Sequence, residues 1–201
     1  MYHERQKWAL CGVHAINNLL QEPKLDKTFF DTICEELAPS SSKYWNPHRS
    51  VLGLGNYDVN VLLVILERQG FQVKWHDLRD TITSATLHAY FPINEQKNCD
   101  SVDSVAPTQS QPESASATAR ATAAATFGIV VNLPSTGIWG TLSKGRHWAT
   151  LLWSREKKVW MNLNSELKQP EEIGDFEQCA KLLQHWQREK GECPILLARR
   201  D

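Results

Sequence analysis

Near its beginning the chain reads Ala9-Leu10-Cys11-Gly12-Val13-His14-Ala15-Ile16-Asn17-Asn18-Leu19-Leu20. Apolar residues recur here four, three and four positions apart, at Ala9, Val13, Ile16 and Leu20. This spacing predicts an amphipathic helix that starts near Cys11, after a polar segment. The unpaired N–H groups and the positive dipole end at a helix start favour a thiolate. Cys11 is therefore a candidate nucleophile, although an isolated cysteine is more often a small buried hydrophobe.

The chain then continues mainly as helices. We expect a helix over residues 27–37 with Asp26 as its N-cap, and another over residues 57–69 with Asn56 as its N-cap. Residues 71–75 alternate between polar and apolar, which predicts a strand.

The second half has the pattern of strands. We expect them at residues 127–133, 146–153, 158–164 and 194–198. A helix over residues 175–188 is also expected, because Asp175 and Gln178 form a capping-box pair. Helices first and strands later indicate an α+β fold and not a parallel α/β sheet.

One segment differs in composition from the rest. Residues 94–126 contain 8 Ala, 5 Ser and 4 Thr, and Val102 and Val105 are their only large aliphatic residues. Such a segment cannot bury enough apolar surface to offset the entropy of ordering. We expect a disordered, low-complexity insertion in a single domain that spans residues 1–201, with an ordered helical hairpin as the alternative.

The overall composition excludes several classes of protein. The chain has 22 Lys and Arg against 23 Asp and Glu, a formal net charge of −1, so bulk electrostatics gives no reason to bind nucleic acid. Its longest aliphatic run, residues 61–66, is far shorter than the about 20 residues of a membrane helix, and we expect no integral membrane segment. The 5 cysteines form no CxxC pair, so we expect neither a disulfide scaffold nor a metal site. We expect the protein to occupy a reducing compartment.

A cysteine nucleophile needs a base, and the base needs a group that orients it. His147 is the best placed of the 7 histidines, because it begins a predicted strand. If the following hairpin turn centres on residues 155–156, His147 faces Asn164, and a shift of one residue brings Asn162 opposite it instead. Periodicity alone does not choose between the two asparagines, which are also ordinary residues for a strand end.

Four further polar residues lie near Cys11 in the sequence. Gln6 could donate a hydrogen bond to an oxyanion, although from position alone a solvated surface glutamine is the simpler interpretation. His14, three residues after Cys11, is expected to have a structural role. Of Asn17 and Asn18, we expect one to be buried and the other to lie at the surface.

Taken together, these residues resemble the Josephin family of papain-like cysteine proteases. The matching blocks are Tyr2-His3-Glu4-Arg5-Gln6, Leu10-Cys11, His14, Asn17-Asn18-Leu19, His147-Trp148 and Trp160-Met161-Asn162-Leu163-Asn164-Ser165. Residues 52–61 and 170–174 resemble the small subgroup that consists of little besides the Josephin domain. The resemblance covers nearly the whole chain outside residues 94–126. It implies a helical subdomain packed on a mainly antiparallel sheet.

The resemblance also implies a role for each site residue. It assigns the nucleophile to Cys11, the general base and acid to His147, the orienting residue to Asn164 and the oxyanion helper to Gln6. The small subgroup often has Asp where this chain has Asn164, and asparagine lacks the charge that would stabilise an imidazolium. No cofactor and no metal is implied. As a hypothesis, Trp148 helps to form a narrow slot for the glycines at the ubiquitin tail.

The activity implied by the resemblance is that of a cysteine-type deubiquitinase. Such an enzyme hydrolyses the isopeptide, peptide or thioester bond after the C-terminal glycine of ubiquitin, and its partners are ubiquitin and ubiquitinated proteins. A ubiquitin-binding pseudoenzyme or scaffold with weak or no catalysis is the alternative, and a hydrolase of small amides or thioesters is a further one. We expect a cytoplasmic protein that is also found in the nucleus.

Overall fold

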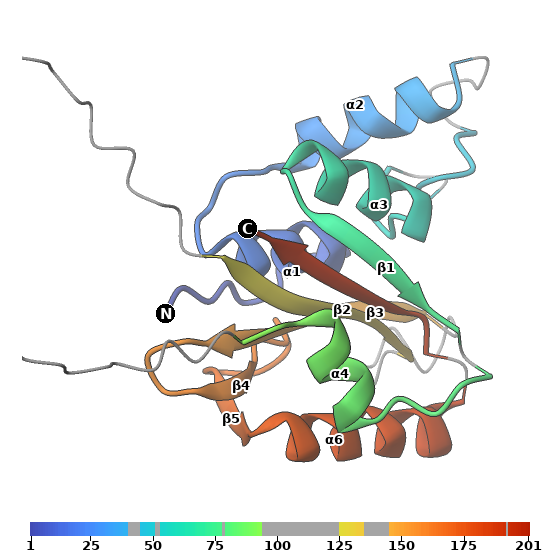
Figure 1. Cartoon of the computed structure of the whole chain (residues 1–201). Coiled ribbons are helices and arrows are strands. Elements are labelled where there is room, and N and C mark those ends of the chain that lie inside the picture. The colour runs from blue at the N-terminus through green and yellow to red at the C-terminus, as the bar shows by residue number, and fades with distance from the viewer. Residues whose placement is uncertain (40–44, 51–52, 78, 94–124, 135–144, 192) are drawn as a thin grey trace, which may run out of the picture.

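The computed structural model describes residues 1–39, 45–50, 53–77, 79–93, 125–134, 145–191 and 193–201. Within these ranges the chain forms five helices and six strands (Figure 1). The helices are α1 (Cys11–Leu20), α2 (Lys27–Leu37), α3 (Val59–Arg68), α4 (Ser84–Tyr90) and α6 (Phe176–Lys190). The strands are β1 (Gln72–His76), β2 (Thr126–Pro134), β3 (Arg146–Ser154), β4 (Val159–Asn162), β5 (Glu171–Gly174) and β6 (Ile195–Arg200).

All six strands belong to one sheet, in the order β1-β6-β2-β3-β4-β5. Every pair of neighbouring strands is antiparallel. This sheet and its helices confirm the α+β fold that the sequence predicted. Strand β3, which carries His147, lies between β2 and β4 in the interior of the sheet.

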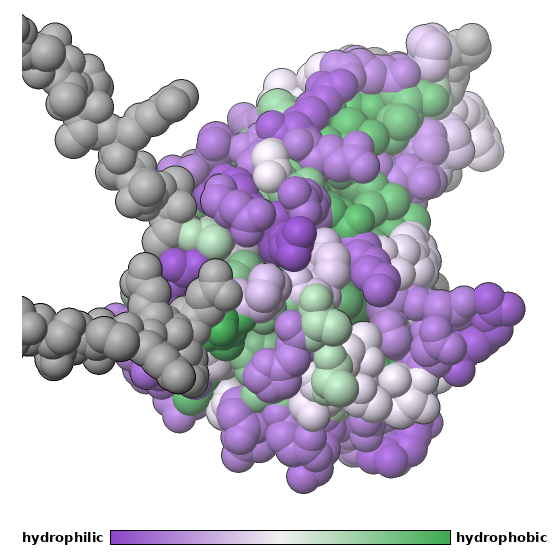
Figure 2. Space-filling model, in the orientation of Figure 1, coloured by the Kyte–Doolittle hydropathy of each residue, from purple (hydrophilic) through white to green (hydrophobic). Residues whose placement is uncertain are grey.

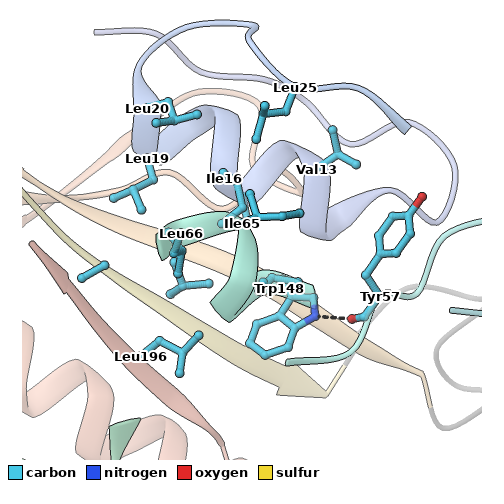
Figure 3. Packing of buried hydrophobic residues seen from close by; sticks show 14 of the residues in the cluster. Val13, Ile16, Leu19, Leu20, Leu25, Tyr57, Ile65, Leu66, Trp148 and Leu196 are labelled. Carbon is cyan, nitrogen blue, oxygen red and sulfur yellow. Dashed lines mark hydrogen bonds between the residues drawn. The ribbon is translucent and has the colours of Figure 1, made fainter. Parts of the chain in front are cut away.

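The sheet separates two hydrophobic cores. Helices α1, α2 and α3 pack over one face, where they meet side chains such as Trp148 and Leu196 (Figure 3). Helices α4 and α6 cover the other face, where Trp160 is fully buried. The sequence predicted one layer of helices on the sheet, and the structure has a layer on each face. Apolar atoms also gather at the surface over α2 and α3, on a face that is otherwise mostly hydrophilic (Figure 2).

Helix α1 lies close against the sheet because β2 has a glycine beneath it. A Cβ atom built on Gly128 would lie 2.1 Å from Leu19 Cδ1, so a larger residue there would force the Leu19 side chain to move. The hydroxyl of Thr150 in β3 also donates a hydrogen bond of 2.7 Å to the carbonyl of Ala15. The hydrogen bond of Thr150 ties the helix whose first residue is Cys11 to the sheet.

Capping residues set the ends of the helices, as in isolated peptides. Asp26 caps α2, and the capping box of Asp175 and Gln178 begins α6, which confirms both predictions. The prediction for the third helix was wrong at its start. Asp58, and not Asn56, accepts hydrogen bonds from the first turn of α3. Helix α4 and strand β5 were not predicted, and they are only 7 and 4 residues long.

The register of the β3–β4 hairpin differs from both alternatives considered. Leu151 pairs with Asn162 and Ser154 with Val159, so the turn spans residues 155–158. Its centre lies at residues 156–157 and not at residues 155–156. Lys158 adopts a left-handed backbone with φ 55° at the end of this turn. A turn without Gly or Asn-Gly carries little register information, and the pairing of the two strands decides it.

The predicted insertion lies largely outside the described residues, which resume at Ala125. Thr126, which the sequence analysis assigned to the insertion, instead begins β2 and pairs with Arg200. No helix in the described parts of the chain is long and apolar enough to cross a membrane.

Candidate active site

Cys11 is the first residue of α1 and is buried, with 3% of its surface exposed. The preceding residue, Leu10, gives the helix no side-chain cap, so no side chain at the N-cap accepts from the first N–H groups of α1. The backbone N–H groups of Gly12 and Trp148 both hydrogen-bond the Cys11 sulfur. The thiol therefore lies between the start of α1 and strand β3, beside the residue that follows His147.

The protonation of the Cys11 thiol differs from the sequence-based expectation. Burial raises its pKa above the ordinary value, and the backbone N–H groups of Trp148 and Gly12 oppose this effect without cancelling it. The carboxylate of Glu166 raises the pKa further. The helix start thus favours the thiolate as predicted, but desolvation outweighs it, and the resting cysteine is a thiol.

His147 is held by Asn164, as the resemblance implied. Its Nε2 lies 2.6 Å from Asn164 Oδ1, and the backbone N–H of Glu166 donates to the same atom over 3.0 Å. An atom that accepts this N–H is an oxygen, so the Nε2 of His147 carries the proton. The Nδ1 of His147 is then the basic nitrogen. Asn162 has another task, because its Oδ1 accepts the backbone N–H of Asn164 over 3.0 Å.

Glu166 is a residue of the site that the sequence analysis missed. Its Oε1 lies 3.9 Å from Nδ1 of the buried His147, and its own side chain is 30% exposed. No strand period pointed to this contact, because Glu166 lies in a turn that follows Asn164, where the backbone N–H of Leu167 donates to the carbonyl of Asn164 over 3.0 Å. The approach of its side chain to His147 depends on how that turn folds.

Gln6 lies on the N-terminal segment, next to the residues that hold His147. Its backbone N–H donates to the carbonyl of Ser165 over 2.8 Å. Its side-chain Nε2 donates to the carbonyl of Trp8 over 3.1 Å, which leaves one amide hydrogen for a further acceptor. Its Oε1 is buried and has no hydrogen-bond partner among the described residues.

Two polar residues of α1 hold this N-terminal segment in place. His14 accepts the backbone N–H of Lys7 at Nε2 and lies 2.5 Å from Glu4 through Nδ1, which fits the structural role expected of it. Asn18 accepts the backbone N–H of Glu4 over 2.6 Å and donates to the carbonyl of Leu163 over 2.9 Å. It therefore joins the segment of Gln6 to the segment of Asn164.

The expectation that one of Asn17 and Asn18 lies at the surface was wrong. The two side chains are 2% and 0% exposed. Asn17 is held inside because it donates to the carbonyl of Leu25 and accepts the backbone N–H of the same residue, each over 2.9 Å.

Trp148 lies in the core beside Cys11, with 4% of its surface exposed. Its indole N–H donates to the carbonyl of Tyr57 over 2.8 Å, as the dashed line in Figure 3 shows. A Cβ atom on Gly12 would lie 3.6 Å from the Trp148 ring, so the ring packs against the start of α1. Trp148 therefore supports the helix that carries Cys11, and a contact with the substrate stays a prediction.

Several known proteins are similar to this chain in sequence. Josephin-2 of Mus musculus and of Homo sapiens are each 35% identical to this chain over 178 residues, which cover 87% of this chain and 73% of the relative. A Josephin-like protein of Drosophila melanogaster is 31% identical over 188 residues, or 91% of this chain and 67% of that protein.

The sequence profile of one family, described as Josephin, matches residues 6–98 and 88–196. These two matches together include the segments of Gln6, Cys11, His147 and Asn164. They confirm the resemblance that the short motifs predicted, and the chain belongs to the Josephin family.

Proposed function

We propose that this protein is a thiol-dependent deubiquitinase that cleaves the bond after the C-terminal glycine of ubiquitin. Josephin family membership supports the general class of activity. The observation that carries the proposal is the hydrogen bond of 2.6 Å between His147 and Asn164, formed where the Cys11 sulfur contacts the backbone of the residue after His147. A nucleophile, its base and an orienting group are the parts that cysteine-based acyl transfer requires.

The proposed reaction begins with a neutral Cys11 thiol. His147 takes the thiol proton at Nδ1 while the sulfur attacks the glycine carbonyl carbon of the substrate. Asn164 keeps the imidazole in the required tautomer through Nε2. The free amide hydrogen of Gln6 and the backbone N–H of Cys11 stabilise the oxyanion. His147 then protonates the leaving amine, and water hydrolyses the thioester.

One feature favours a second function, a ubiquitin-binding module with weak or no catalysis. Cys11 and His147 are 3% and 2% exposed, and the pKa of the Cys11 thiol is raised by burial. A buried and protonated nucleophile reacts slowly unless substrate binding opens the site. The two functions predict the same binding partner and differ in covalent chemistry.

The test uses ubiquitin whose C-terminal carboxylate is replaced by an electrophile. The deubiquitinase is expected to form a 1:1 covalent adduct, visible by intact-protein mass spectrometry, that Cys11→Ser abolishes. Cys179→Ser is the matched control, because Cys179 is also buried but belongs to the core on the other face of the sheet. Tight binding without an adduct would support the binding module. Absence of both the adduct and binding would contradict both functions.

A second measurement tests the base. His147→Ala is expected to lower turnover of a ubiquitin substrate with an amide leaving group by at least about 100-fold, the usual contribution of general acid–base catalysis. Circular dichroism should show an intact fold for this variant. Retained turnover would remove His147 from the mechanism.

A further inference from the structure

The new inference concerns Glu166 and rests on the proposed function. Asn164 orients His147 but carries no charge, so it does not offset the positive charge that the imidazole gains when it takes the Cys11 proton. In acyl transfer by a thiol and an imidazole, this charge exists from proton transfer until the leaving amine is protonated. A nearby carboxylate would stabilise the imidazolium over that interval.

Glu166 has the position that this task requires. Its Oε1 lies 3.9 Å from Nδ1, the nitrogen that takes the proton, while Asn164 occupies Nε2 on the other side of the ring. With Nδ1 deprotonated, its lone pair faces a carboxylate, which is unfavourable. With Nδ1 protonated, the same geometry is an ion pair. Because His147 is only 2% exposed, solvent screens this interaction incompletely.

The backbone of Glu166 fixes this geometry. Its N–H donates to Asn164 Oδ1 over 3.0 Å, and the carbonyl of neighbouring Ser165 accepts the backbone N–H of Gln6. The carboxylate therefore starts from a main chain tied to the orienting residue and to the N-terminal segment. Substitution of its side chain alone leaves both backbone contacts in place.

We propose that Glu166 is a positioning residue for His147 that stabilises the imidazolium from the Nδ1 side and so provides the negative charge that Asn164 lacks. Cys11 Sγ loses its proton to Nδ1 as the bond to the substrate carbonyl carbon forms. The proton then leaves Nδ1 for the amine nitrogen as the carbon–nitrogen bond breaks. Glu166 itself neither gives nor takes a proton.

Other charged groups lie around this pair in the described residues. Cys11 is near the Glu166 carboxylate, which raises the pKa of the Cys11 thiol. His3 lies on the N-terminal segment, where its Nε2 is 3.1 Å from the carbonyl of Asn164. Arg146 precedes His147, but its guanidinium donates to the carbonyl of Asn132 over 3.0 Å. Glu166 is therefore expected to raise the ionisation pH of both members of the Cys11–His147 pair.

The test compares Glu166→Gln with wild type in the rate of capture by the ubiquitin electrophile between about pH 5 and pH 10. Loss of the carboxylate is expected to move both limbs of the pH–rate profile to lower pH by about one unit, the size expected for a unit charge about 4 Å away that solvent screens in part. The rate at the optimum should fall about fivefold. Lost packing would lower the rate without moving the limbs.

Two further variants sharpen this comparison. Glu172→Gln makes the same chemical change on β5, where Glu172 pairs with Lys157, and should leave the profile unchanged. Asn164→Asp provides a charge on the Nε2 side, so in that background Glu166→Gln should lower the rate by a smaller factor than in the wild type. The proposal would be overturned if the limbs of the pH–rate profile did not move in Glu166→Gln. It would also be overturned if Glu166→Gln lowered the rate by the same factor in the wild-type and Asn164→Asp backgrounds.

Failure of this proposal can be told from failure of the proposed function. Alkylation of Cys11 by iodoacetamide needs no ubiquitin, and Glu166→Gln should move its pH dependence in the same direction. If wild type does not react with the ubiquitin electrophile, the proposed function fails, and the alkylation profile still decides the role of Glu166. An alkylation profile equal to that of wild type would overturn that role.

Discussion

At the scale of single residues, the environment of Cys11 combines opposing effects. The start of α1 and the backbone of β3 direct N–H groups at the sulfur and favour the thiolate, while burial and the carboxylate of Glu166 favour the thiol. Desolvation is the largest of these effects, so the pKa is raised. A raised pKa of the thiol disfavours a preformed ion pair of thiolate and imidazolium, so the proposed reaction starts with a proton transfer.

This protonation state has a measurable consequence. A thiol with a raised pKa stays protonated above about pH 8.5, where an ordinary cysteine ionises. The rate of Cys11 alkylation by iodoacetamide, measured by peptide mass spectrometry, is therefore expected to keep rising with pH beyond that value. A rate that is already constant between about pH 5 and pH 7 would instead indicate a preformed thiolate.

At the scale of elements, the site depends on how α1, β3 and the segment after β4 meet. Thr150 bonds α1 to β3, and Asn18 bonds α1 to the carbonyl of Leu163. Strand pairing ends at Asn162, and Asn164 turns its side chain to His147 although it is not the direct partner of His147 in the hairpin. Asn164 reaches the imidazole because the chain leaves the strand after Asn162. Strand register alone does not predict this contact.

Trp148 allows a test of this arrangement. Trp148→Ala is expected to lower the free energy of unfolding by about 3–5 kcal/mol, because it empties a core site. Trp148→Phe keeps an aromatic ring but leaves the carbonyl of Tyr57 without its donor, a loss of about 1–3 kcal/mol. Denaturant unfolding measures both changes.

The same variants separate a core role from a substrate role. If Trp148 acts only in the core, the folded fraction of Trp148→Phe should react with the ubiquitin electrophile like wild type. Unchanged stability together with altered selectivity for the ubiquitin tail would instead support the predicted slot.

At the scale of the whole molecule, one sheet carries helices on both faces, and the proposed site lies on the side of α1. The sequence segment with the insertion falls between α4, which packs in the core of α4 and α6, and β2, which contributes to both cores. Residues 94–124 lie outside the described part of the chain, so the single domain with a disordered insertion remains a sequence-based proposal.

That proposal predicts the effect of a deletion. Removal of residues 98–124 is expected to change the melting temperature by no more than about 3 °C, since the cost of loop closure varies slowly with loop length. Differential scanning calorimetry of the full chain and the deletion variant measures this change. A loss of more than about 10 °C would show that the segment contributes to the core.

Part of this molecule could be read from the sequence because the relevant information is local. Helical periodicity predicted α1 with Cys11 at its start, and capping residues marked the starts of α2 and α6. The short elements α4 and β5 were missed, since 7 and 4 residues are too few for a clear period. Motif resemblance then chose Asn164 over Asn162, where physical reasoning left both open.

The sequence by itself determined the types of the main elements and singled out Cys11, His147 and Asn164 as the proposed site, because each follows from local spacing or a short motif. Only the tertiary structure decided the hairpin register, the position of Glu166 beside Nδ1 and the raised pKa of the Cys11 thiol. The physical reason is that strand pairing, contacts between distant segments and desolvation depend on atoms far apart in the sequence.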